Sequence, residues 1–512
     1  MSSVPKLLSA YVEGVDAHIV HVEADLHVGL VSFSIVGLAD KAVSEAKERV
    51  NSALKNSGIK PPSRENRRVT INLAPADVKK AGSHFDLPIA LSYLLASGQL
   101  NSFSFDDKLF LGELSLDGAL RPVPNSLSVA LLARRRGIRS LFLPPQNAEE
   151  ASAVEGVDVI PVRTLTELLA HLENTAPIAP HPRDAHSPTY PPSLISVGDI
   201  KGHASAKRAL VVAAAGGHHL FMTGSPGTGK TMLAQALVSL LPPPTHEECI
   251  AITRIYSAAG LNKTTPFVRH RPFRAPHHTA SPASILGGGS IPRPGEMSLA
   301  HRGVLFLDEV AEFRRDVLEG LRQPLESGEV RIARARASLR LPAHFTLVAA
   351  MNPCPCGYHN DEYRDCRCTA HEVARYQKKI SGPLLDRIDI QLTIPHIPLE
   401  ELRSSSYDVS QETSFREQVR AARETQAARF RQLELPFSTN AEMRSKDVDT
   451  HIRLHPSAEA FLATILKNSH LSTRGYYRVL KLAQTVADLD AAPAVTKDHI
   501  GEAFQYRLKE EV

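Results

Sequence analysis

The sequence has few aromatic residues, no long apolar run and little net charge, and these shortages exclude several classes of protein. Of its 512 residues 5% are aromatic, 43% hydrophobic and 22% charged, which is typical of a globular protein and not of a disordered or fibrous one. No apolar run approaches the roughly 18 residues that a membrane-spanning helix needs. Residues 1–13 lack the apolar stretch of a secretory signal. We therefore expect a cytoplasmic protein.

The net charge of +4 is too small to indicate a nucleic-acid partner by itself, so any DNA site must be argued from where the basic residues lie. Cysteine is also scarce. Of the five cysteines, four fall between Cys354 and Cys368. In a reducing compartment such clustering favours a metal site over disulfides.

The length predicts about three domains. Residues 174–193 are rich in proline and polar residues and are predicted to be a linker. Before it, residues 1–173 show strand patterns at 69–73, 140–143 and 157–162 and helix patterns at 42–55 and 127–135, which predict a mixed α/β domain. After it, we expect an α/β core over 194–396, with a strand at 220–223 and a helix at 231–241. Residues 397–512 are predicted to be a helical lid, most clearly at 411–429 and 458–466.

The segment GSPGTGKT at 224–231 matches the phosphate-binding loop pattern GxxxxGK[ST] between a strand and a helix. Its glycines allow backbone N–H groups to face phosphates, and the helix N-terminus adds positive potential. Lys230 is predicted to pair with the β and γ phosphates of ATP, and Thr231 to bind Mg²⁺. The expected nucleotide-binding residues are Gly224, Ser225, Pro226, Gly227, Thr228, Gly229, Lys230, Thr231 and Asp308. A chance match is the alternative, which the next motif disfavours.

The segment VLFLDE at 304–309 has four apolar residues typical of a buried parallel strand, followed by two carboxylates. Two acids at such a strand end are costly without a cation. We predict that Asp308 binds the magnesium ion and that Glu309 polarises the attacking water. The alternative is that these two acids are merely solvated at the end of a strand. This alternative is less favoured because the strand follows a phosphate loop in the sequence.

Three further residues are candidates for the same chemistry. Asn352 follows an apolar strand and could orient the lytic water, or could simply form a turn before Pro353. Arg387 could reach the γ phosphate bound by a neighbouring subunit, or could form a salt bridge with Asp386 or Asp389. Arg474 could reach the nucleotide from the lid.

Cys354, Cys356, Cys366 and Cys368 form two CxC pairs separated by nine residues. Four thiolates on a short hairpin suit a tetrahedral zinc ion, and Gly357 allows a sharp turn. A closed shell of four sulfurs leaves no position for a substrate, so we expect a structural zinc. Four reduced surface thiols are the alternative, and they would be prone to oxidation.

Seven segments together resemble the AAA+ ATPases of the magnesium chelatase I-subunit type, and within them the ComM/YifB group. They are DIKGHASAKRAL (199–210), GSPGTGKT (224–231), RPFRAPHHTASPASILGGG (271–289), VLFLDEVAEF (304–313), AAMNPCPCG (349–357), SGPLLDRIDI (381–390) and STRGYYRVLKLAQTVADL (472–489). The resemblance covers nearly the whole chain. It implies an AAA+ P-loop NTPase core, with a parallel sheet and helices on both faces, and a C-terminal α-helical lid. It further implies that Asn352 is sensor 1, Arg387 the arginine finger and Arg474 the sensor 2 arginine of a homohexamer.

Residues 30–172 resemble the Lon protease domain and the related domain of the RadA recombination ATPase, which implies a Lon/S5-like α+β fold. The segments are FSIVGLADKAVSEAKERV (33–50), FLGELSLDGALRPV (110–123) and GIRSLFLPPQN (137–147). Lon catalysis needs a serine and a lysine. Here His84 lies near the serine position, with Ser83 beside it, and Val129 lies at the lysine position. Since nothing replaces the lysine that activates the nucleophile, we expect a non-proteolytic domain that supports the ring or binds DNA.

Two basic segments are candidate DNA contacts. Residues 329–340 carry arginines on a strand-like pattern, of which Arg334 and Arg336 should share a face of a hairpin. A solvated hairpin without a binding role is the alternative, which charge alone does not disfavour. In related rings a hairpin here points into the pore, where arginines could follow a phosphate backbone. The insert at 258–297 adds Lys263, Arg271 and Arg274. Similarity to ComM implies an ATP-dependent DNA helicase or translocase that drives branch migration in homologous recombination during natural transformation. Its expected partners are single-stranded or branched DNA and recombination proteins. The alternative is a chelatase-like motor that remodels a protein for metal insertion.

Overall fold

We analysed a computed structural model of the chain, which describes residues 5–64, 66–183, 189–190, 195–261, 266–289, 292–333, 338–404, 409–468 and 471–507. The chain divides into two compact units. The first comprises Met1–Ser187 and His246–Val268, and the second Pro188–Thr245 and Arg269–Val512. Residues 246–268 lie in the core segment predicted from the sequence, yet they pack within the first unit. The cause is apolar burial, because Cys249 and Phe267 belong to one buried cluster with Leu127.

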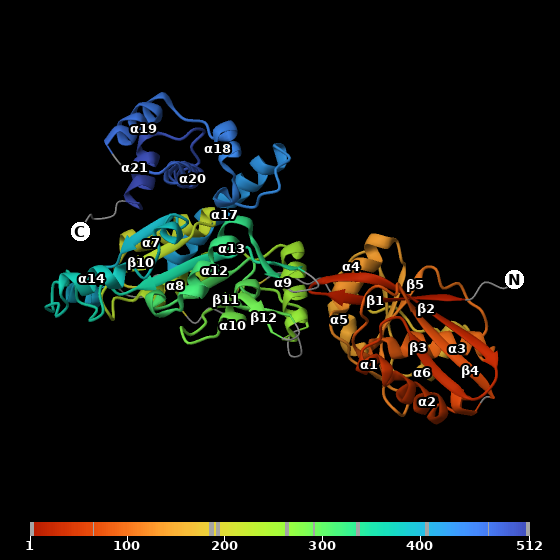
Figure 1. Cartoon of the computed structure of the whole chain (residues 1–512). Helices are drawn as coiled ribbons and strands as arrows, with labels where there is room; N and C mark the ends of the chain where they lie inside the picture. The colour runs from red at the N-terminus through yellow and green to blue at the C-terminus, as the bar shows by residue number, and fades with distance from the viewer. Residues whose placement is uncertain are drawn as a thin grey trace. The chain divides into compact units, whose positions relative to one another are not determined.

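The first unit is built on a seven-stranded sheet in the order β3-β4-β2-β1-β5-β8-β9 (Figure 1). Its strands are β1 (Lys6–Glu13), β2 (Asp16–Val28), β3 (Ser32–Val36), β4 (Arg67–Ala74), β5 (Lys108–Phe110), β8 (Ser140–Leu143) and β9 (Asp158–Pro161). Strands β1, β2 and β4 pair antiparallel, whereas the pairs that include β3, β5, β8 or β9 are parallel. In β4, Val69, Ile71 and Leu73 are buried, as the predicted alternation requires.

The helices of this unit are α1 (Lys41–Ser44), α2 (Ala46–Asn56), α3 (Asp86–Ser97), α4 (Ser126–Arg136), α5 (Ala148–Ser152), α6 (Leu165–Leu172) and α9 (His246–Ala259). The helix predicted over 42–55 is divided at Glu45 into α1 and α2. Asp40 starts α1 because its carboxylate accepts the Val43 N–H at 2.8 Å. Residues 86–94 of α3 are all buried, so this helix forms the centre of the unit. The mixed α/β prediction is confirmed.

The second unit contains a five-stranded parallel sheet in the order β11-β14-β17-β10-β18. The strands are β10 (Leu220–Thr223), β11 (Phe273–Arg274), β14 (Val304–Leu307), β17 (Thr346–Met351) and β18 (Ile390–Thr393). Alternate residues enter two different cores. Phe306 and Val348 join the cluster that contains α7 (Ala204–Gly216) and α8 (Lys230–Leu240). Leu305 and Leu347 join the cluster on the opposite face. Helices therefore cover both faces, as predicted.

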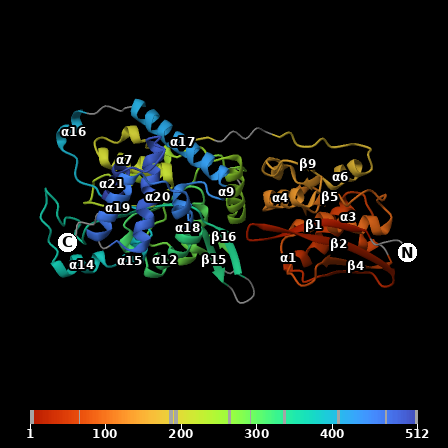
Figure 2. The same ribbon diagram turned by 90° about the horizontal axis from the view of Figure 1, so that it is seen from above.

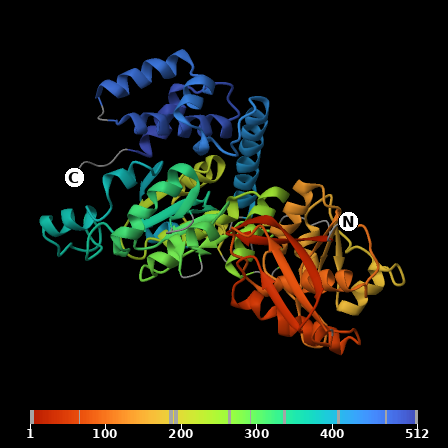
Figure 3. The same ribbon diagram turned by 45° about the vertical axis from the view of Figure 1, so that its right-hand side comes forward.

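Residues 409–468 and 471–507 follow as helices and connecting loops, drawn in blue in Figure 3. The helices are α17 (Val409–Gln432), α18 (Ser445–His451), α19 (Pro456–Asn468), α20 (Thr473–Leu489) and α21 (Lys497–Gln505). Both α17 and α20 pack against α7, which joins this helical region to the sheet domain. The predicted helices at 411–429 and 458–466 correspond to α17 and α19. No helix within the described part of the chain combines the length and apolarity that a membrane crossing requires.

A separate antiparallel hairpin precedes β17 in the chain. It pairs β15 (Glu329–Ala333) with β16 (Ser338–Pro342), both labelled in Figure 2. The predicted strand-like pattern at 329–340 is therefore a hairpin. Arg334 and Arg336, which fall between these two strands in the sequence, lie outside the described residues.

Candidate functional site

The phosphate-binding loop lies between β10 and α8, as the sequence predicted. Gly227 and Gly229 have φ angles of 83° and 84°, in the left-handed region that glycine adopts without a Cβ penalty. Helix α8 begins at Lys230, so its N-terminal N–H groups lie at the loop. The Lys230 side chain is buried, and its Nζ donates to the carbonyls of Gly224 (2.7 Å) and Ser225 (2.9 Å). The loop is thereby held closed around the lysine.

The carboxyl ends of three neighbouring parallel strands bring the other predicted residues to this loop. Lys230 Nζ donates to Asn352 Oδ1, which follows β17, at 3.3 Å. Thr231 Oγ1 donates to Asp308 Oδ2, which follows β14, at 2.8 Å. Five of the six predicted catalytic and magnesium-binding positions in the core therefore meet at one edge of the sheet: Lys230, Thr231, Asp308, Glu309 and Asn352.

Charge at this edge is arranged around the lysine. Burial lowers the pKa of Lys230, and the nearby carboxylates of Asp308 and Glu309 oppose that shift. Glu309 itself has a positive φ of 50°. Its Oε2 lies 3.7 Å from Nδ1 of His278, which comes from the insert at 258–297. No motif in the sequence predicted this contact. The oxygens of Thr231 and Asp308 are the ligand type that Mg²⁺ prefers, so these residues fit that ion.

Arg387, the remaining core position, and Arg474 meet at a different place. Arg387 is buried, donates to the carbonyl of Pro383 at 2.6 Å and pairs with the carboxylate of Glu326 in α13 (Arg322–Ser327). Arg474 Nη2 lies 3.6 Å from the same Glu326 oxygen. Arg387 therefore forms a salt bridge with Glu326, and not with Asp386 or Asp389, the two partners that the sequence suggested. Asp389 pairs with Arg478 of α20. No signal in the sequence pointed to Glu326.

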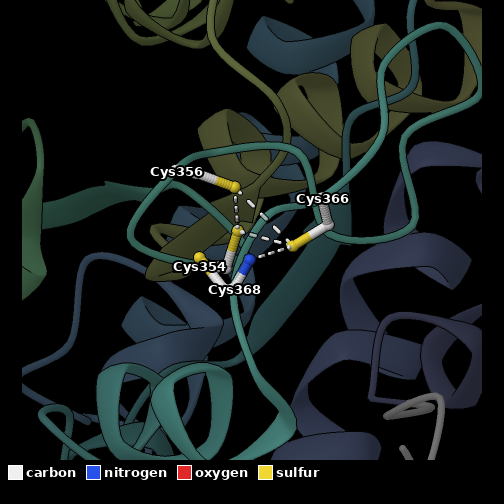
Figure 4. A group of neighbouring side chains, drawn as sticks. All are labelled: Cys354, Cys356, Cys366 and Cys368. Carbon is white, nitrogen blue, oxygen red and sulfur yellow. Dashed lines mark hydrogen bonds between the residues drawn. The ribbon is translucent and has the colours of Figure 1, made fainter.

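The four clustered cysteines bring their sulfur atoms together, as Figure 4 shows. Sγ of Cys354 lies 3.3 Å from that of Cys356 and 3.7 Å from that of Cys366, and Cys356 and Cys366 are 3.6 Å apart. A tetrahedral ion with Zn–S bonds of about 2.3 Å requires sulfurs about 3.8 Å apart. All four ligand atoms lie within 4.8 Å of one another. The cluster could therefore hold a metal such as zinc, and Gly357 makes its turn with a φ of 88°.

Of the basic residues predicted to contact DNA, Arg271 and Arg274 already bind other groups of the chain. Arg271 is buried and donates to the carbonyls of Pro242 (2.6 Å) and Arg302 (2.8 Å). Arg274 forms a bidentate pair with Glu296 at 2.6 and 2.8 Å. Both guanidinium groups are thus engaged within the chain. Lys263 lies outside the described residues, as do Arg334 and Arg336.

At the base of the hairpin, Arg331 of β15 is directly opposite Arg340 of β16, and both side chains are exposed. Like charges in facing positions destabilise a strand pair. Arg331 also lies 3.9 Å from Glu329, which offsets part of that repulsion. The described part of the hairpin therefore presents two facing cations.

In the first unit, the positions that correspond to a Lon active site carry no Ser–Lys pair. The Ser83 hydroxyl donates to Glu113, and His84 Nε2 lies 3.0 Å from the carbonyl of Ala10. Burial lowers the pKa of His84 to about 4. Val129 is buried in the apolar core. Lys80 is also buried, but its Nζ makes no hydrogen bond to any described residue, Ser83 included.

A parallel sheet with a phosphate loop, a strand ending in Asp-Glu and a polar residue after the next strand define a P-loop ATPase of the AAA+ class. Comparison with protein families agrees. Residues 196–402 match the magnesium chelatase subunit ChlI family, residues 22–147 match subunit ChlI of Mg-chelatase, and residues 410–507 match the ChlI C-terminal family.

Similar individual proteins show to which family within this class the chain belongs. Competence protein ComM of Haemophilus influenzae is 41% identical over 497 residues, covering 96% of this chain and 95% of ComM. The uncharacterized protein YifB of Escherichia coli is 40% identical over 495 residues, covering 96% and 95%. A Lon protease of Chloroflexus aurantiacus is 31% identical over 165 residues, 30% of this chain and 20% of the protease. The chain belongs to the ComM/YifB family of magnesium chelatase ChlI-like AAA+ proteins.

Proposed function

We propose that the protein is a hexameric AAA+ ATPase that acts as an ATP-dependent DNA helicase or translocase and promotes branch migration during natural transformation. The observation that carries the ATPase part is the meeting of Lys230, Thr231, Asp308 and Asn352 at the carboxyl edge of one parallel sheet. The DNA part rests on similarity to a competence protein along 96% of the chain.

In this proposal Gly224–Thr231 binds the phosphates of ATP through its N–H groups and Lys230. Thr231 and Asp308 hold Mg²⁺, which, when bound, neutralises charge on the transferred phosphoryl group. Glu309 accepts a proton from the attacking water, and Asn352 orients that water. Lys230 already donates to Asn352, so the sensor and the phosphate loop share a contact through which γ-phosphate binding can move both.

In this proposal Arg387 acts across the subunit boundary, and Arg474 reaches the nucleotide from the lid. Both side chains are directed to Glu326, and within the described residues neither one forms an ion pair with Asp308 or Glu309. A group with no contact to its own site is suited to serve the site of a neighbour. A phosphate there would replace Glu326 as the anion that the two guanidinium groups bind.

The proposed DNA-binding surface is the β15–β16 hairpin. Arg331 and Arg340 supply facing cations at its base, and the segment between the two strands in the sequence adds the cationic residues Arg334 and Arg336. A phosphate backbone between them would relieve the like-charge repulsion that the strand pairing creates. Arg271 and Arg274 are left out of this surface because their guanidinium groups are engaged within the chain.

The domain limits proposed are a non-proteolytic Lon-like domain at 1–173, a linker at 174–193, the AAA+ core at 194–396 without residues 246–268, which pack within the first unit, and the helical lid at 397–512. The four cysteines hold a structural zinc ion. The first domain supports the ring or binds DNA, since the Ser83 hydroxyl is directed to Glu113 and no lysine among the described residues donates a hydrogen bond to it.

Displacement of a labelled strand from a forked or three-stranded DNA junction tests this function. We expect ATP-dependent displacement by the wild-type protein and none by Glu309→Gln. An active ATPase that displaces no strand from any junction, under low-salt conditions, would refute the DNA part.

A second function has a specific observation in its favour, because three ChlI families together match residues 22–147, 196–402 and 410–507. It is a protein-remodelling motor that drives metal insertion. ATPase stimulation by a protein partner, with none by DNA, would favour it.

A further inference from the structure

The cysteine cluster is joined to the phosphate loop by direct contacts. The loop from Cys354 to Cys368 begins two residues after Asn352, so it starts at the nucleotide edge of the sheet. Cys354 is fully buried, and Gln377 of α14 (Ala370–Gln377) donates to the carbonyl of Pro353 at 3.2 Å. The first metal-binding position is therefore fixed close to the proposed sensor residue.

Asp361, in the middle of the loop, has a completely buried side chain. Its carboxylate accepts the N–H groups of Tyr363 and Arg364, both at 2.9 Å, which fixes the fold of the loop. It also accepts a hydrogen bond from the side chain of Ser225 in the phosphate loop. His396 Nε2 lies 2.8 Å from its Oδ2. One carboxylate thus joins the cysteine loop, the phosphate loop and the segment that follows β18.

A steric contact reinforces this connection. A Cβ on Gly357 would lie 2.7 Å from both Cγ and Cδ of Pro226, so the two loops touch at a distance that only glycine allows. Ile394, two residues before His396, approaches the loop as well, since a Cβ on Gly224 would lie 2.6 Å from its carbonyl oxygen. The phosphate loop is therefore packed between the cysteine loop and the end of β18.

We propose that the Cys354–Cys368 loop, when its four sulfurs hold zinc, positions the phosphate loop through Asp361 and Gly357, so that zinc binding and ATP binding strengthen each other. Asp361 is a positioning residue, because it contacts Ser225 and not the reacting atoms. The inference rests on the ATP site proposed above and is independent of DNA. Zinc closes the loop that carries Asp361, and an ordered Ser225–Pro226 segment presents its N–H groups to the phosphates with less loss of freedom.

The coupling must be reciprocal, because linked binding equilibria change each other by the same factor. If zinc tightens ATP binding, then a bound nucleotide must slow the loss of zinc. Known couplings of this kind span roughly 5- to 150-fold. A cluster with no connection to the phosphate loop would release zinc from the folded protein at a rate that does not depend on the nucleotide.

The first test compares nucleotide affinity in two matched variants of the full chain, titrated with a fluorescent ATP analogue after metal analysis. Asp361→Ala is expected to keep its zinc and to bind the analogue roughly tenfold more weakly, the effect of losing a charged hydrogen bond. The control is Glu362→Ala, which removes the same charge from the exposed neighbour and should bind as the wild type does. Equal affinity in Asp361→Ala, with zinc present, would overturn the proposal.

The second test does not use Asp361→Ala, so it remains decisive even if that variant fails to fold or loses zinc. Zinc release to a chromogenic chelator is followed with and without a non-hydrolysable ATP analogue. The analogue is expected to slow release at least fivefold, and Lys230→Ala should abolish this protection. Unchanged release in the presence of bound analogue would overturn the coupling. Absence of nucleotide binding to the zinc-loaded wild type would instead refute the ATP site itself.

Discussion

Lys230 is the residue on which nucleotide binding should depend most directly. It is buried, it donates to two carbonyls of its own loop, and it reaches Asn352 across the site. We predict that Lys230→Ala abolishes ATP binding, whereas Glu309→Gln binds ATP and hydrolyses it roughly 10²- to 10⁴-fold more slowly because the proton acceptor is lost. Nucleotide titration and steady-state phosphate release separate the two effects. Wild-type hydrolysis by either variant would contradict the assigned roles.

Arg387 is the residue proposed to act on the ATP site of a neighbouring subunit. Arg387→Ala should retain nucleotide binding and lose roughly 10³- to 10⁵-fold in hydrolysis rate, as expected for an arginine that neutralises transition-state charge. In rings mixed with Lys230→Ala subunits some activity should return, because intact ATP sites then face intact arginines. Arg375→Ala, on the exposed side of α14, is the control. If mixed rings stay inactive, the arginine does not act between subunits.

For individual residues, the sequence predicted which ones would form the site but not all of their contacts. The phosphate loop and the strand-end acids are local patterns, so Lys230, Thr231 and Asp308 could be identified directly, and the parallel sheet brought them to one edge. The partners of Arg387 and Asp361 could not be predicted. Glu326 is 61 residues from Arg387 in the chain, and pairing over such distances leaves no pattern in a single sequence.

Among the elements, the β15–β16 hairpin carries the sharpest prediction. Replacing Arg331 and Arg340, or Arg334 and Arg336, by alanine should abolish strand displacement and DNA stimulation while basal ATP hydrolysis continues, because none of these residues is among those predicted to bind or hydrolyse ATP. DNA binding should also depend less steeply on salt, since each lost phosphate contact removes about one released counterion. The measurements are displacement assays and salt titrations, with Arg375→Ala and Arg431→Ala combined as the control.

Full displacement by both hairpin double variants would show that DNA does not bind along this hairpin.

Elements were predicted well from periodicity where they are amphipathic, as in β4 and α17. The segment 246–268 was assigned to the core segment after the linker because sequence order was the only guide. Burial of Cys249 and Phe267 with Leu127 places it in the first unit, a tertiary preference that no local pattern reveals.

For the whole molecule, the fusion of a Lon-like unit to an ATPase raises the question of proteolysis. We predict that the purified protein does not degrade casein with or without ATP, and that Ser83→Ala changes nothing. The Ser83 hydroxyl is directed to the Glu113 carboxylate, and Lys80 makes no hydrogen bond to it. Casein cleavage that is lost in Ser83→Ala would show that this unit is an active protease.

The central claim is that ATP hydrolysis at the sheet edge is coupled to DNA. Its most direct test is the ATPase rate of the wild-type protein with and without single-stranded or forked DNA, at about 50 mM and about 200 mM salt. The account predicts that DNA raises the rate at the lower salt concentration, that the rise shrinks at the higher one, and that Lys230→Ala shows no activity in either. An unchanged rate together with no DNA binding at the lower salt concentration would contradict it.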